Sequence, residues 1–159
     1  MKLVRASAKR FWFQFRKREM DRLKTVLKFY PCIPSAYQRL TKSTGLPDAE
    51  ASQKLLDEAL ADQRAENKKR LAVFLAAPGR LAANAAGFQL SLSPGELEWL
   101  LQVLNDIRVG SWVILGSPEH RIESVNERTA PHIWAMEVAG SFQMGFLEEV
   151  EGRRAAGEG

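Results

Sequence analysis

The sequence has very little cysteine and histidine, and it has no long hydrophobic run. Its 159 residues include one cysteine, Cys32, and two histidines, His120 and His132. A single cysteine excludes an internal disulfide framework and a multi-cysteine metal cluster. No apolar run approaches the roughly 20 residues that span a bilayer, and the basic N-terminus lacks the apolar core of a signal peptide. We therefore expect a cytoplasmic chain that does not associate with a membrane.

Lysine is absent from the second half of the chain, and the two halves carry opposite charge. Residues 1–80 hold 18 Lys and Arg against 8 Asp and Glu, whereas residues 81–159 hold 5 against 11. Residues 1–28 are the most basic part, with 10 basic and 2 acidic side chains. Such a block binds nucleic acid, meets an acidic protein surface (a second copy included), or is simply a solvated face. The composition leaves all three readings open.

The sequence also lacks the motifs that carry common enzyme chemistry. It contains no glycine-rich phosphate loop, no dinucleotide fingerprint and no nucleophile elbow. The histidines lack the spacing of a metal site, and Cys32 has only Lys28, one helical turn before it, to activate a thiol. The carboxylates of Glu148, Glu149 and Glu151 are typical of a solvated helix end. We therefore predict no catalytic residue, no cofactor and no metal ion, and a protein that is not an enzyme.

Periodicity of the apolar residues predicts a mostly helical chain. Helical spacing predicts five helices, over residues 17–29, 35–43, 48–77, 94–115 and 130–150. Alternating apolar residues predict two short strands, over 11–15 and 88–92, that pair with each other. We thus expect a mainly α fold. It has four to five helices in one bundle-like domain over 1–150, a minor two-stranded β element, and a disordered tail over 151–159.

A shift of 77 residues superposes two similar segments of the chain. The shift places Phe13 on Leu90 within the two expected strands, and Glu19 on Glu96 in the first turn of the helix that follows each strand. Both segments read as a short strand, a brief turn and an amphipathic helix. We therefore expect two β–α units whose strands form one ribbon.

An aromatic and basic segment near the N-terminus is the first candidate binding surface. Rings that stack on bases, together with cations that follow phosphates, bind single-stranded nucleic acid. The same pattern is typical of an edge strand with its rings inward and its charges outward. The residues that would contact a protein partner or nucleic acid are Lys9, Arg10, Trp12, Arg16, Lys17 and Arg18.

A polar group in the most apolar helix is the second candidate. Asn105 and Arg108 are three residues apart and share a helix face, whereas Asp106 points about 100° away. Polar side chains in a buried helix must be paired or must face a groove. Three readings stay open: a buried network that fixes helix register, a small pocket beside Trp112 or another nearby tryptophan, and a contact with another molecule.

Small residues such as Gly140 recur along the last expected helix. They indicate close packing, because glycine costs about 1 kcal/mol of helix propensity relative to alanine. The large side chains around them, Met136, Phe142, Met144 and Phe146, form either ordinary core or an adaptable protein-binding surface.

The motif Leu104-Asn105-Asp106-x-Arg108, followed by Leu115-Gly116 at the helix end, resembles a bacterial family of small, mostly helical proteins catalogued as a domain of unknown function. The resemblance covers about residues 88–150. It implies non-enzymatic proteins, some encoded near the adaptor of the Clp protease and some labelled possible regulators of transcription. We therefore expect a protein-interaction module of the bacterial cytoplasm, linked to regulated proteolysis. The alternative is a nucleic-acid-binding regulatory protein that uses the basic, aromatic N-terminal segment; a homo-oligomer is compatible with both.

Overall fold

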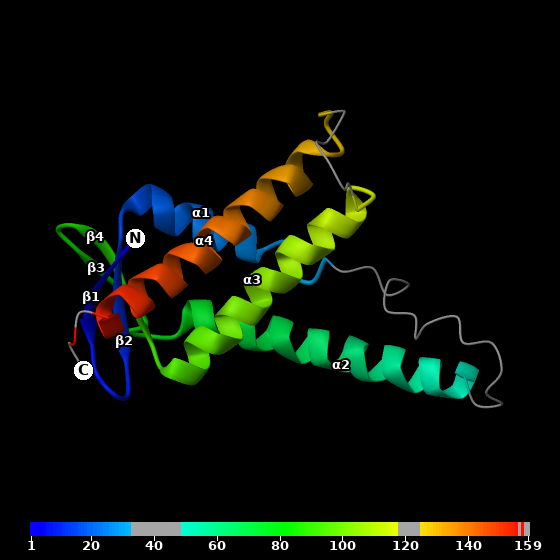
Figure 1. Ribbon diagram of the computed structural model, residues 1–159, viewed down its shortest axis with the longest axis horizontal. Helices are drawn as coiled ribbons and strands as arrows, with labels where there is room; N and C mark the ends of the chain where they lie inside the picture. The colour runs from blue at the N-terminus through cyan, green and yellow to red at the C-terminus, as the bar shows by residue number, and fades with distance from the viewer. Residues whose placement is uncertain (33–48, 118–124, 156, 158–159) are drawn as a thin grey trace.

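The computed structural model describes residues 1–32, 49–117, 125–155 and 157. This part of the chain forms four helices and a four-stranded antiparallel sheet, an α+β fold (Figure 1). The strands are β1 (Lys2–Ala6), β2 (Phe11–Phe15), β3 (Leu81–Asn84) and β4 (Gly87–Leu92). The helices are α1 (Lys17–Leu27), α2 (Ala49–Ala76), α3 (Pro94–Ile114) and α4 (Ala130–Ala155).

The expectation of a mainly α, all-helical bundle with a two-stranded β element is wrong. The two expected strands do pair, as β2 and β4, but β1 and β3 extend them on either side in the order β1-β2-β4-β3. A bulge between Leu3 and Arg5 breaks the period of two in β1 and hides its strand pattern. β3 is rich in alanine, which has a low strand propensity. Both edge strands are therefore set by pairing rather than by their own residue pattern.

The helices that the structure describes begin close to where the apolar periodicity predicts them. α4 continues to Ala155, five residues beyond the expected helix end at 150. The short helix expected over 35–43 lies outside the described residues.

The inner face of the sheet carries the core. Phe13 lies opposite Leu90 on the neighbouring strand, and both side chains are buried. The ring of Phe13 meets Phe146 of α4 edge-on, with centroids 4.9 Å apart. In the described part of the chain the helices lie on this side, and the other face of the sheet is open (Figure 1). The core therefore lies between one sheet face and helices α1, α3 and α4.

The helices are joined by side-chain hydrogen bonds as well as by apolar packing. α3 and α4 run antiparallel, and Gln143 Nε2 donates to the Leu101 carbonyl at 3.2 Å. α2 is held by Asn67, whose Oδ1 accepts from Trp99 Nε1 at 3.1 Å and whose Nδ2 donates to the Tyr30 hydroxyl at 3.2 Å. These bonds explain why a polar residue interrupts the apolar stripe of α2.

The sheet and two of the four described helices form two similar ββα units. The hairpin β1–β2 leads into α1, and the hairpin β3–β4 leads into α3. At the start of α1, Glu19 Oε2 accepts from the Arg16 N–H at 2.8 Å. At the start of α3, Glu96 Oε2 accepts from the Ser93 N–H, also at 2.8 Å. The two units thus share their helix-start chemistry as well as their order of elements.

Candidate binding surfaces

The open face of the sheet carries polar side chains from all four strands. Side chains alternate along a strand, so Trp12 and Gln14 point away from the buried Phe13. Arg5 lies opposite Trp12, and Lys2 lies opposite Gln14, because the bulge in β1 keeps both cations on this face. The polar and aromatic side chains on the open face are those of Lys2, Arg5, Arg10, Trp12, Gln14, Asn84, Gln89 and Ser91. None of the four described strands contains Asp or Glu.

Contacts between these side chains hold them in place. The guanidinium carbon of Arg5 lies 4.5 Å from the centroid of the Trp12 ring. Arg10, directly before β2, donates from Nη1 to Ser91 Oγ on the neighbouring strand β4 at 2.7 Å. Gln14 and Asn84 form two side-chain hydrogen bonds, of 3.1 and 2.9 Å. The face is therefore an ordered surface of cations, amides and one large ring.

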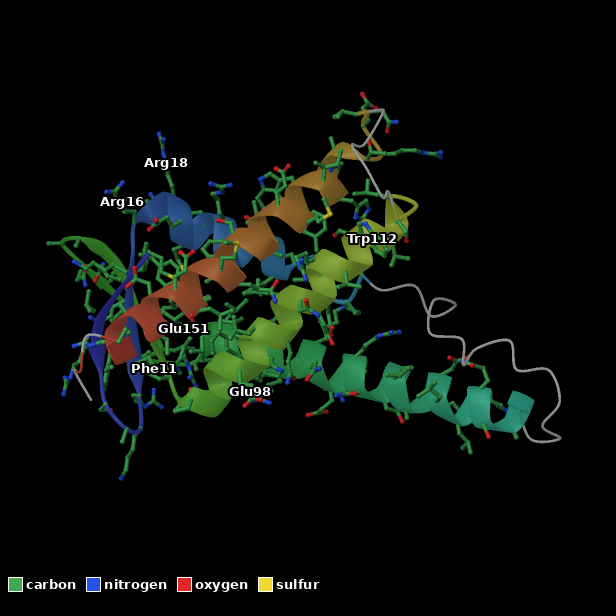
Figure 2. All side chains as sticks on the ribbon, in the orientation of Figure 1. Phe11, Arg16, Arg18, Glu98, Trp112 and Glu151 are labelled. Carbon is green, nitrogen blue, oxygen red and sulfur yellow. The ribbon has the colours of Figure 1, made fainter. Side chains whose placement is uncertain are left out.

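The N-terminal residues predicted from sequence fall in three places. Arg10 and Trp12 belong to the open face, and Lys9 is exposed in the turn between β1 and β2. The group Arg16–Arg18 is exposed at the start of α1, and Figure 2 shows Arg16 and Arg18 extending away from the body. Lys2 and Arg5 also lie on the open face, but the sequence pattern does not predict them because it does not indicate β1.

The polar group of α3 is divided between two sides of that helix. Arg108 Nη2 donates to Asn105 Oδ1 at 3.2 Å on the outer side, where Trp112 also lies. Asp106 lies on the side of Cys32, whose thiol donates to the carbonyls of Asp106 and Ile107 at 3.6 and 3.3 Å. Asn105, Arg108 and Trp112 are therefore together, and Asp106 is apart from them.

Burial is the main influence on the pKa values of the two titratable groups on this side of α3, Asp106 and Cys32. It raises the pKa of the Asp106 carboxyl, and the charge of Arg64 only partly opposes that effect. Burial also raises the pKa of the Cys32 thiol, against a smaller opposite effect of its hydrogen bond with Ser111. A raised thiol pKa favours the neutral form, which is a poor nucleophile. This region therefore has the properties of packed interior.

A groove of about 630 Å³ runs between α3 and α4 on their outer side. It is lined by Arg108, Val109 and Trp112 of α3 and by Met136, Glu137, Gly140, Ser141 and Met144 of α4. Met144 is 62% exposed, and a Cβ at Gly140 would lie 3.4 Å from Arg108 Cδ. Phe142 and Phe146 pack against the sheet instead. Of the four large side chains around the small residues of α4, the two methionines thus face the groove and the two phenylalanines face the core.

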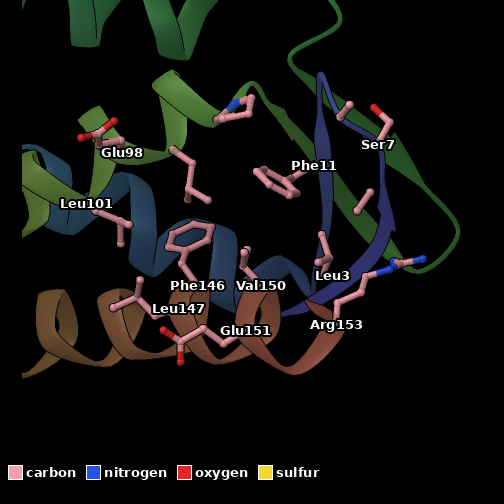
Figure 3. Close-up of a pocket in the computed structure, with 14 residues that line it drawn as sticks. Leu3, Ser7, Phe11, Glu98, Leu101, Phe146, Leu147, Val150, Glu151 and Arg153 are labelled. Atoms are coloured by element: carbon pink, nitrogen blue, oxygen red, sulfur yellow. The ribbon is translucent and has the colours of Figure 1, made fainter. Parts of the chain in front are cut away.

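A cavity of about 610 Å³ opens between the β1–β2 hairpin, the start of α3 and the end of α4 (Figure 3). Its walls are mainly apolar, and the rings of Phe11 and Phe146 border it. The carboxylates of Glu98 and Glu151 and the guanidinium of Arg153 point away from it (Figure 3). The volume is in the range of small-ligand sites, and the interior offers apolar contact.

The described residues contain neither a candidate metal site nor a helix that could span a membrane. No group of three or more His, Cys, Asp and Glu side chains in this part of the chain could hold a metal ion. No helix among these residues is both long and apolar enough to cross a membrane. His132 meets the ring of Phe29 edge-on, and His120 lies outside the described residues.

No protein-family model, no curated protein and no solved structure matches this chain. The resemblance of residues 88–150 to a family of small helical bacterial proteins stays a prediction, and so does the link to regulated proteolysis.

Proposed function

We propose that this chain is a non-enzymatic binding protein of the bacterial cytoplasm, and that its open sheet face binds single-stranded nucleic acid. The proposal rests on which side chains the open face presents. Three cations, a tryptophan and three side-chain amides lie together on, or directly before, strands that contain no acidic residue. The cations complement phosphates, and the ring and the amides complement bases.

The arrangement of these groups suits an extended strand with unpaired bases. Cations stand at both ends of β2, with Lys9 and Arg10 before it and Arg16–Arg18 after it. A five-residue strand is about 17 Å long, so a nucleic-acid backbone between these cations would pass Trp12. A base can stack on the Trp12–Arg5 pair only when it is not stacked inside a duplex. We therefore expect single strands to bind more tightly than duplexes.

The alternative partner for this face is an acidic protein surface, and with that partner the chain would be a protein-interaction module. It would use the same cations, but it would gain less from Trp12 and from the amides. The effect of the Trp12 ring on affinity, measured separately from the effect of the cations, therefore distinguishes nucleic acid from an acidic protein as the partner.

The test is fluorescence anisotropy with a labelled single strand and a duplex of equal length, across a salt series. We expect the affinity for the single strand to fall with salt by a slope of about 0.7 per phosphate contact. Trp12→Val should weaken binding about tenfold, because one stacked base contributes about 1–3 kcal/mol. Trp12→Phe should keep most of the affinity. Changing Arg16, Lys17 and Arg18 together to Glu should flatten the salt slope.

Lys69→Glu is the matched control, because Lys69 is exposed on α2 and lies outside the sheet. It should leave the affinity within about twofold if only the open face binds. Thermal unfolding of each variant checks that the fold is kept. Absence of binding at low salt, or equal losses for Lys69→Glu and Arg5→Glu, would overturn the proposal. So would charge reversals that abolish binding while Trp12→Val has no effect, a result that favours an acidic protein partner.

A further inference from the structure

We propose that the open sheet face prefers adenine among the bases of a single strand, and that the side-chain amide of Gln89 recognises it. This inference rests on the proposed function and names the base that the face selects. The preference follows from the place of Gln89 beside Trp12 and from the partners that the other polar side chains already have.

Gln89 lies next to the ring on which a base would stack. Trp12 pairs with Ser91, and Gln89 precedes Ser91 by two residues on the same face of β4. Trp12 and Gln89 are therefore diagonal neighbours, about 7–8 Å apart, a distance that aromatic and long side chains span. A base that stacks on Trp12 can thus place one edge at the Gln89 amide.

The surroundings of Gln89 leave its amide open to a ligand. The residue opposite it on β3 is Ala82, and the residue two positions earlier on β4 is Gly87. Both residues are too small to cover the amide. Gln89 is partly exposed, and its amide forms no hydrogen bond with any residue in the described part of the chain. The amide can therefore donate to a base and accept from it at the same time.

The other side chains near the ring already have partners on the face. Arg5 lies over the Trp12 ring, and Arg10 donates to a serine of β4. Gln14 is joined to Asn84 by two side-chain hydrogen bonds. The guanidiniums that would favour guanine are thus engaged, and the four described strands contain no carboxylate to accept from the cytosine amino group.

Adenine is the base that best complements a single carboxamide. Its 6-amino group donates and lies between two acceptors, N1 on the Watson–Crick edge and N7 on the Hoogsteen edge. A carboxamide has one acceptor oxygen and one donor NH2, so it fits adenine on either edge. The Hoogsteen edge of guanine carries two acceptors, and a pyrimidine offers only its Watson–Crick edge, so these bases fit the amide in fewer orientations.

The test compares three single strands of equal length by fluorescence anisotropy. The first is a run of thymidines, and the second carries one adenine at its centre. The third carries unsubstituted purine in place of that adenine, so it keeps the stacking surface but lacks the 6-amino group. We expect the adenine strand to bind about tenfold more tightly than the purine strand, because the amino group completes a two-bond contact with the amide.

Gln89→Leu removes the amide and nearly keeps the size of the side chain. It should reduce the difference between the adenine and purine strands to less than about twofold, while the thymidine strand still binds. Gln63→Leu is the matched control, because Gln63 is exposed on α2 and lies outside the sheet. It should keep the full preference for adenine, and circular dichroism checks the folding of both variants.

Failure of this inference can be distinguished from failure of the proposed function. Salt-dependent binding of the thymidine strand that Trp12→Val weakens, without any preference for adenine over purine, would overturn the role of Gln89 alone. A preference for adenine that Gln89→Leu leaves intact would overturn it as well. A chain that binds none of the three strands at low salt would overturn both the proposed function and the preference.

Discussion

Gly87 stands at the first position of β4, where the chain passes closest to the end of β2. Its φ is +128°, a region that other residues rarely adopt, and an added Cβ would collide with the Phe15 carbonyl oxygen. We predict that Gly87→Ala lowers the free energy of unfolding by about 2–3 kcal/mol, because the strained backbone and the collision add together. Urea denaturation followed by circular dichroism measures this loss.

Gly95 is the matched control for Gly87. It lies in the first turn of α3, with no heavy atom within 4 Å of an added Cβ. Gly95→Ala should therefore leave stability unchanged or raise it by about 0.5–1 kcal/mol. If both alanine variants had equal stability, the close approach of Gly87 to β2 would be refuted.

At the scale of a whole element, the start of α3 depends on one carboxylate. Glu96 accepts a hydrogen bond from the Ser93 N–H and pairs with Arg80. Burial raises the pKa of Glu96, but these hydrogen bonds outweigh burial and hold the pKa below its ordinary value of 4.5. The carboxylate thus stabilises the folded state above the unfolded-state pKa, and this contribution is lost as the pH falls through the folded-state pKa.

We predict that Glu96→Gln lowers the free energy of unfolding at pH 7 by about 1 kcal/mol. The difference from wild type should shrink at pH 3, where protonation weakens the same interactions in the wild-type chain. Urea titrations at the two pH values measure this change. Glu98→Gln, an exposed position on the same helix, is the control and should have little effect at either pH. A Glu96→Gln deficit that is equally large at pH 3 would show that ionisation is not its cause.

Elements with local signals are those that the sequence predicts correctly. The start of α3 is one, because Ser93 and Glu96 are three residues apart and need no distant partner. The sequence does not predict β1 and β3, because each is held by a neighbouring strand and neither has a regular apolar alternation. The same limit applies to the candidate surface. Arg10 and Trp12 were predicted from the β2 pattern, whereas Lys2 and Arg5 need β1 to be known.

At the scale of the molecule, the two ββα units meet in the middle of one sheet. The shift of 77 residues makes Phe13 and Leu90 equivalent, and the pairing of β2 with β4 places these two residues opposite each other. A local two-fold axis therefore passes near this pair. Each unit, from Lys2 to Leu27 and from Leu81 to Ile114, is shorter than the roughly 40 residues that a domain needs to bury a sufficient core of its own. Both units thus depend on the shared core between them.

This dependence predicts that the two units lose stability together. Phe13 is fully buried, and Phe13→Ala removes its ring from Phe146 and from Leu90. We expect a loss of about 3–5 kcal/mol, a large part of the stability of a domain of this size. Native-state hydrogen exchange should report the same loss for the most protected amides of β2 and of β4, because one cooperative transition exposes both strands.

Val73→Ala on α2 is the control for this measurement, and as an exposed truncation it should change stability by less than about 0.5 kcal/mol. The informative comparison is between the strands of the two units. If Phe13→Ala lowered the protection of β1 and β2 while β3 and β4 kept theirs, each unit would have its own stability. The two segments related by the shift of 77 residues would then be independent folding units, and the shared sheet would be only the place where they dock. Equal losses in all four strands would instead mean that neither unit is stable without the strand that the other supplies.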